Sequence, residues 1–178
     1  MKKLAVAFIS VLLLFLASDM DAQAQDSVNN FKKQFDQHFR YASRVLSLAK
    51  AMPAESYSWR PEKGVSSVEE VYTHIARYNY YYLQNSLGIP APENVDVDQI
   101  ESITGKRQVV DILERSIAHV QSAIKDMPAA KLRQQTELYG REVNGQAVLM
   151  QLITHMSEHV GQSIAYARVN GVVPPWNR

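Results

Sequence analysis

The chain has 178 residues, of which 46% are hydrophobic and 21% charged, and its formal net charge is +1. These values describe one ordinary globular domain that can bury a core, and the near-neutral charge gives no reason to expect nucleic acid as a partner. The sequence contains no cysteine, which excludes disulfides, a cysteine nucleophile and a thiolate zinc site, so histidine and carboxylate groups would have to hold any metal.

Residues 1–24 have the pattern of a secretory signal peptide. Two lysines precede the apolar run Leu4–Ala17, and an A-x-A cleavage site ends at Ala24. The apolar run is shorter than the ~20 residues that a membrane span needs, although an uncleaved anchor is the alternative. We therefore expect an exported protein, periplasmic or secreted, with a single domain at 25–178 and no stable membrane association after cleavage.

Four stretches of the mature chain have the apolar spacing of amphipathic helices. The stretches are about 27–52, 67–88, 104–125 and 145–171. The second opens with a capping box, Ser67-x-x-Glu70, and Ser66-x-x-Glu69 is an alternative one residue earlier. Residues 91–102 form a long polar connection between the second and third helices, and 134–143 are expected to be extended or irregular. This pattern predicts an all-α fold, a four-helix bundle in which the long connection between helices 2 and 3 can cross the bundle.

The last predicted helix carries His155 and His159 four residues apart. At ~100° and ~1.5 Å per residue, the two imidazoles lie about 40° apart and roughly 6 Å along the same face, beside the apolar stripe. Gln162 and Tyr166 continue this line. Two histidines so placed can converge on one metal ion, although the same spacing also occurs where both are solvated or simply hydrogen-bonded.

The three other histidines are weaker candidates. His74 lies one turn into the second helix beside its apolar stripe, where a structural role is the more common one unless the fourth helix supplies partners. His38 lies on or near the inward face of the first helix and is expected to be buried and bonded to a neighbour. His119 lies off the apolar stripe of the third helix and is expected to be solvated.

Two groups of motifs resemble the DinB family, and together they cover the mature chain in order. The first is Tyr57-Ser58-Trp59-Arg60-Pro61, then Gly64-Val65-x-Ser67-Val68-x-Glu70 and His74-Ile75-Ala76. The second is His155-x-x-x-His159-x-Gly161-Gln162, then Tyr166-x-Arg168-x-Asn170-Gly171-x-x-Pro174-Pro175. The resemblance implies a DinB/YfiT-like four-helix bundle in which His74, His155 and His159 hold one divalent metal ion.

Family members include thiol-dependent transferases and isomerases, so the resemblance implies a metal-dependent enzyme, hydrolase or thiol transferase, with an unidentified small-molecule substrate. Three imidazoles with water in an open position form a zinc-type catalytic arrangement, and nickel, iron or manganese are alternatives to zinc. Glu158 is a candidate base, although it also fits a solvated helix acid, and Gln162 could bind the metal's water or orient a histidine.

Two positions depart from the family pattern. Many relatives carry arginine where this chain has Val160, and many carry arginine where it has Ser66. If those arginines contact an anionic substrate or cofactor, that binding mode is in doubt here. The alternative function is a non-catalytic metal-binding protein, or a homodimeric interaction protein in which the His triad is structural.

Overall fold

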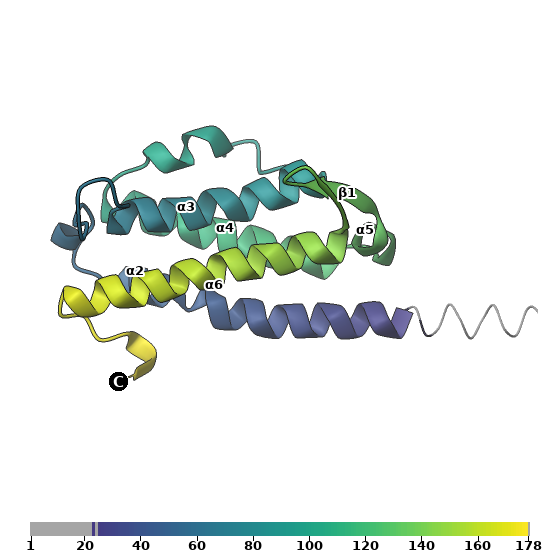
Figure 1. The fold of residues 1–178 in the computed structure, drawn as a ribbon, viewed down its shortest axis with the longest axis horizontal. Coiled ribbons are helices and arrows are strands. Elements are labelled where there is room, and N and C mark those ends of the chain that lie inside the picture. The colour runs from purple at the N-terminus through teal and green to yellow at the C-terminus, as the bar shows by residue number, and fades with distance from the viewer. Residues whose placement is uncertain (1–22, 24, 178) are drawn as a thin grey trace, which may run out of the picture.

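The computed structural model describes residues 23 and 25–177, and most of them are helical (Figure 1). The expected signal peptide, except for Gln23, lies outside the described residues. In the part of the chain that is described, no helix is both long enough and apolar enough to span a membrane.

The first predicted helix is interrupted once. Residues 25–43 are helical, Arg44 adopts a turn, and α2 continues at Val45–Ala51. The Ser47 amide donates to the Arg44 carbonyl three residues back, so the chain tightens there by part of a turn without changing its course. The Arg44 guanidinium lies 3.7 Å from the centroid of the Tyr41 ring and 4.5 Å from that of Trp176, which ties the C-terminal segment to this turn.

The second predicted helix begins where the capping box places it. In α3 (Val68–Tyr81) the Glu70 amide donates to the Ser67 hydroxyl, and the Ser67 amide donates to the Glu70 carboxylate at 2.7 Å. This reciprocal pair satisfies two amides that the first helical turn leaves without partners. A π-helical turn, Tyr82–Ser86, extends α3.

The long connection carries helical structure of its own. Residues Val97–Ser102 form a 3-10 helix that packs along α3, above it in Figure 1. The third long helix, α4 (Lys106–Asp126), follows it. The connection therefore covers one side of α3 before the chain enters α4.

Residues 134–143 are extended, as expected, but they form a small sheet that an all-α fold lacks. After the short helix α5 (Ala129–Arg133), β1 (Gln135–Leu138) pairs antiparallel with β2 (Arg141–Asn144). Positive φ values at Tyr139 (53°) and Gly140 (75°) form the tight turn between the strands. The last long helix, α6 (Gly145–Val169), starts at Asn144, whose side chain accepts from the Ala147 amide.

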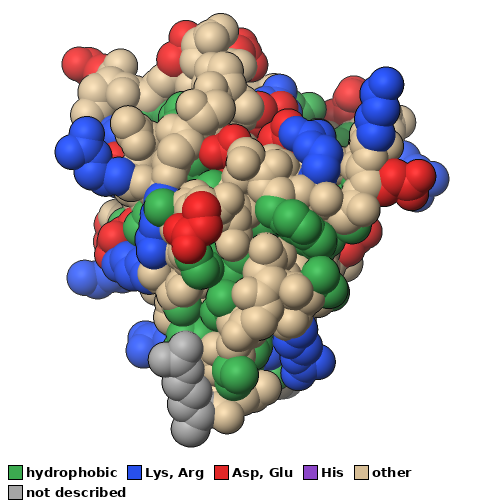
Figure 2. Space-filling view, turned by 90° about the vertical axis from the view of Figure 1, so that its left-hand side faces the viewer, with side chains coloured by type: hydrophobic (Ala, Val, Ile, Leu, Met, Phe, Trp, Pro, Cys, Tyr) green, Lys and Arg blue, Asp and Glu red, His purple; other side chains and the backbone are tan. Residues whose placement is uncertain are grey.

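The long helices pack around one apolar core. α3 contacts α4 and α6, and α2 contacts the same two helices. Short 3-10 helices at Ala54–Ser56 and Pro175–Asn177 complete the described elements. Figure 2 views the end of the molecule where α3 begins and α6 ends, and apolar side chains gather there among charged ones.

Two histidines differ from expectation. His38 is exposed, because the helix at 25–43 buries its neighbouring residue Phe39, and a step of ~100° turns His38 away. His119 is half-buried instead of solvated, because its ring lies 5.1 Å from that of Tyr80 where α3 and α4 pack together. Burial lowers the pKa of His119.

We expect opposite effects from the same substitution at two glycines of α6. A Cβ at Gly145 would overlap the Lys131 carbonyl oxygen and lie 3.1 Å from the Leu132 Cα, whereas a Cβ at Gly161 would meet no atom within 4 Å. Gly145→Ala should therefore lower the free energy of unfolding by about 1–3 kcal/mol, since backbone must move. Gly161→Ala should raise it by roughly 0.5–1 kcal/mol. Chemical denaturation measures both, and equal effects would contradict this packing.

Candidate metal centre

Three histidines converge where α3 packs against α6. One ring nitrogen from each of His74, His155 and His159 lies within 4.8 Å of the other two. The Nε2 atoms of His74 and His155 are 3.1 Å apart, and the three pairs of ring centroids are separated by 5.0, 4.9 and 4.6 Å. The structure thus brings together the histidine pair of α6 and His74 of α3.

Local structure explains this convergence. The capping box sets where α3 begins, and His74 lies between buried Thr73 and Ile75, at the edge of the face that packs on its neighbours. On α6, Met156 and Val160 are buried, each directly after one of the two histidines. The apolar stripes thus hold the two helices together and leave the imidazoles half-buried along the seam.

The three imidazoles fit one divalent ion. Nitrogen ligands of a tetrahedral zinc ion, at ~2.0–2.1 Å from the metal, lie roughly 3.3 Å from one another. One pair already has this separation and the others lie within 4.8 Å, so modest side-chain rotations would complete the set. With imidazole nitrogen as the donor, zinc, nickel, copper and iron are suitable metals.

Glu101 orients His74. The Nδ1 atom of His74 lies 2.6 Å from the Glu101 carboxylate, which belongs to the 3-10 helix of the long connection. A carboxylate only accepts, so Nδ1 carries a proton and directs Nε2 toward the other two imidazoles, where it could bind a metal. Arg77 lies 3.8 Å from the second carboxylate oxygen and helps to hold Glu101 in place.

Gln162 orients His159 in the same way. The Nδ1–H group of His159 donates to the Gln162 carbonyl oxygen at 2.8 Å. The Gln162 amide then donates to the Tyr166 hydroxyl at 3.0 Å, and this hydroxyl donates to the Ser66 carbonyl at 3.1 Å. Each donor in the series has an acceptor, and the series ends on backbone beside the capping box of α3.

The surroundings of His155 oppose protonation of its imidazole. Burial, followed by the nearby His159 and His74, lowers the pKa of His155 to about 3. Its imidazole is therefore neutral at physiological pH, which is the form that binds a metal. The Tyr78 ring lies against both His74 and His155, with centroids 4.6 and 4.5 Å from theirs.

The two other residues that the sequence suggested, Gln162 and Glu158, have different positions relative to the triad. Gln162 lies beside His159, whereas Glu158 is exposed on α6, one residue before that histidine. Sequence analysis missed Glu101, since it follows His74 by 27 residues and no local spacing relates the two. The only feature of the sequence that pointed toward Glu101 was the acidic character of the connection between the second and third helices.

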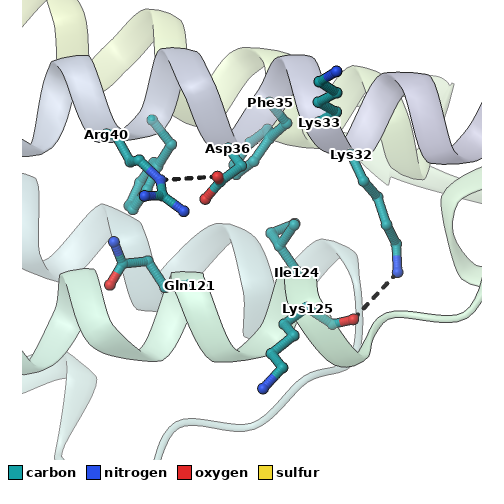
Figure 3. Close-up of a pocket in the computed structure, with 9 residues that line it drawn as sticks. Lys32, Lys33, Phe35, Asp36, Arg40, Gln121, Ile124 and Lys125 are labelled. Atoms are coloured by element: carbon teal, nitrogen blue, oxygen red, sulfur yellow. Dashed lines mark hydrogen bonds and ion pairs between the residues drawn. The ribbon is translucent and has the colours of Figure 1, made fainter.

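A large surface groove lies away from the triad. It has a volume of about 570 Å³ and separates the helix at 25–43 from α4. Figure 3 shows Arg40 paired with Asp36 inside it, and Lys32 reaching the Lys125 carbonyl across it. No histidine lines this groove, so its volume has no bearing on the triad.

The family model described as the DinB family matches residues 23–178. The chain belongs to the DinB family. No curated protein matches it.

Solved structures share the DinB fold of this chain. A DinB-like protein from Bacillus cereus is 21% identical, with a TM-score of 0.68 over 80% of this chain and 95% of that one. A DinB-like protein from Bacillus subtilis is 19% identical, with a TM-score of 0.56 over 79% and 94%. A conserved protein from Enterococcus faecalis is 18% identical, with a TM-score of 0.58 over 79% and 94%. At these identities the likeness shows the fold alone.

Removing the Glu101 carboxylate should weaken metal binding without removing a ligand. We expect Glu101→Gln to lower the affinity for Zn²⁺ about tenfold, since a neutral amide replaces the charged carboxylate that raises the basicity of His74. Glu93→Gln, an exposed position on the same connection, is the matched control. Isothermal titration calorimetry measures both affinities, and equal values would contradict this role of Glu101.

Proposed function

We propose that this DinB protein binds one divalent metal ion through His74, His155 and His159 and uses it to hydrolyse a small-molecule substrate. One observation carries the proposal. Two of the three imidazoles have their Nδ1–H groups already bonded to acceptors, Glu101 and Gln162, so their Nε2 atoms are prepared for a metal. Such preorganisation is typical of metal ligands and has little purpose for solvated histidines.

Zinc is the metal that we propose first, with nickel, iron or manganese as alternatives. Three imidazoles and no further protein ligand are typical of catalytic zinc, whereas structural zinc sites are closed by a fourth protein ligand. When bound, a divalent ion supplies a Lewis acid and lowers the pKa of water toward ~7. The protein's own part is to keep His155 neutral and to hold His74 and His159 in fixed orientations.

Gln162 and Glu158 have different roles in this proposal. Both polar ends of Gln162 are engaged, by His159 and by Tyr166, so it is a positioning residue for His159. Glu158 is exposed on α6 and remains the candidate base that would accept a proton from water.

Hydrolysis is favoured over thiol transfer by two positions and by the expected location. Val160 is buried, and Ser66 uses its carbonyl to accept from Tyr166. Neither side chain offers the positive charge that arginine supplies at these places in many relatives. Low-molecular-weight thiols are also scarce outside the cytoplasm, where we propose that this protein resides.

A second candidate is a non-catalytic protein with a structural His triad. Since Glu101 makes His74 an acceptor at Nε2, the Nε2–H group of His155 can donate to it across 3.1 Å without any metal. We also propose that the long helices form a four-helix bundle, composed of residues 25–51 with α3, α4 and α6. A homodimer remains a prediction, and the apolar end in Figure 2 would offer it a surface.

The test is a metal-dependent hydrolysis assay on the untagged domain. We expect about one equivalent of divalent metal by elemental analysis, and hydrolysis of activated esters that a chelator abolishes and zinc restores. His155→Gln and His159→Gln should lose both metal and hydrolysis, while Glu158→Gln should keep the metal and lower kcat about 10²–10⁴-fold. Metal without hydrolysis would favour a non-catalytic role, and no metal would refute the centre itself.

Export is a separate proposal with its own test. The lysines, the apolar run Leu4–Ala17 and the A-x-A site support cleavage after Ala24. We expect mass spectrometry of the full-length protein expressed in a bacterium to find a mature N-terminus at Gln25 in the exported fraction. An intact N-terminus in the cytoplasm would contradict export.

A further inference from the structure

Tyrosine side chains cluster beside the triad. The Tyr78 ring touches His74 and His155, and its centroid is 5.4 Å from that of Tyr81 and 5.5 Å from that of Tyr82. The Tyr82 ring also stands edge-on to His155, with centroids 5.8 Å apart. Aromatic rings at 4.5–7 Å in tilted or edge-on arrangements attract one another, so the cluster is a packed unit that begins at the metal ligands.

The hairpin turn extends this cluster outward. Tyr139 is 58% exposed, and its hydroxyl lies 2.6 Å from the hydroxyl of Tyr82, which is fully buried. Three of these side chains are at least partly exposed to solvent: Tyr78, Tyr81 and Tyr139. We call these three side chains the tyrosine surface. Tyr82 lies beneath it and joins the hairpin to α3.

Tyr139 occupies a backbone conformation that does not suit it. Its φ is 53°, and it is the only residue other than glycine with positive φ among those described. Glycine and asparagine are the usual residues at this position of a two-residue hairpin turn. A large aromatic side chain is therefore held here against local preference, which directs attention to what its ring and hydroxyl do.

The cation beside Tyr78 and Tyr81 is already paired with carboxylates. The guanidinium of Arg77 lies 5.3 and 5.6 Å from the ring centroids of Tyr78 and Tyr81. It also lies within 3.9 Å of Asp98 and Glu101. This cation is therefore not free to bind an anionic ligand group, and the aromatic faces beside it suit an uncharged ring.

We propose that the tyrosine surface selects substrates that carry an uncharged aromatic group beside the atoms that meet the metal, with Tyr139 as the outer specificity residue. This inference rests on the proposed metal centre. It predicts that an aromatic ligand is preferred over one of similar metal-binding chemistry that lacks a ring, and that the Tyr139 ring, more than its hydroxyl, carries the preference.

Two hydroxamates and a cobalt-loaded protein test this inference without any assay of activity. Co²⁺ is used because its visible absorption changes when a ligand binds to it. Acetohydroxamate and benzohydroxamate share the metal-binding group and differ in the ring. We expect Tyr139→Asn to reduce the affinity ratio of benzohydroxamate to acetohydroxamate about two- to tenfold. Asparagine tolerates positive φ, which offsets part of the cost of the lost hydroxyl contact with Tyr82, and circular dichroism of the variant checks its fold.

Two variants serve as controls. Tyr139→Phe retains the ring and should keep the parent ratio. Tyr41→Asn removes a comparably exposed tyrosine, 63% against 58%, from the helix at 25–43 and should also keep it. An unchanged ratio in Tyr139→Asn would overturn the inference. Equal binding of cyclohexanecarbohydroxamate and benzohydroxamate by the parent would overturn the preference for aromatic groups.

Failure of the metal centre would be visible separately. If the protein binds no Co²⁺, or acetohydroxamate leaves its spectrum unchanged, the proposed centre fails and this inference fails with it. If acetohydroxamate binds and Tyr139→Asn leaves the ratio unchanged, the specificity role alone fails and the metal centre stands.

Discussion

The contact between α3 and α6 is the constraint on which the site depends. Apolar packing between these helices places three imidazoles within 5 Å of one another along a half-buried seam. This proximity is unfavourable for any charged imidazole, since burial and the neighbouring rings both oppose protonation, as the low pKa of His155 shows. A divalent cation reverses the balance, because it needs neutral nitrogen donors held close together. The packing thus prepares a site that suits a metal better than a proton.

Polar contacts around the triad connect distant parts of the chain to it. Glu101 links the long connection to His74, while Gln162 and Tyr166 link His159 to the backbone of Ser66. The connection is thus more than a link between α3 and α4, because its 3-10 helix carries a carboxylate to the metal side of α3. A shorter connection could join the same helices but could not supply this acceptor.

Patterns that are local in sequence predicted most of the helices and two of the three histidines that converge. Apolar periodicity, the Ser67–Glu70 box and the i, i+4 spacing of His155 and His159 each depend on residues less than a few turns apart. His74 entered through the family resemblance, and Glu101 escaped notice because its contact is made across 27 residues. His38 was misplaced since one residue of error in helix phase moves a side chain by ~100°. Contacts between elements require the packing itself, which periodicity does not encode.

Two departures from local preference lie on the same side of the molecule as the triad. The capping box and the Asn144 cap follow ordinary local rules. Beside the triad, in contrast, α3 ends in a π-helical turn and Tyr139 is held at positive φ, at a cost of roughly 1–2 kcal/mol. The short distance between the Tyr82 and Tyr139 hydroxyls joins these two departures. Proteins generally retain such costs where they serve a site, and offset them with packing elsewhere. The π-turn, the strained tyrosine and the three close imidazoles are therefore best explained together, as parts of one binding region between α3, α6 and the hairpin.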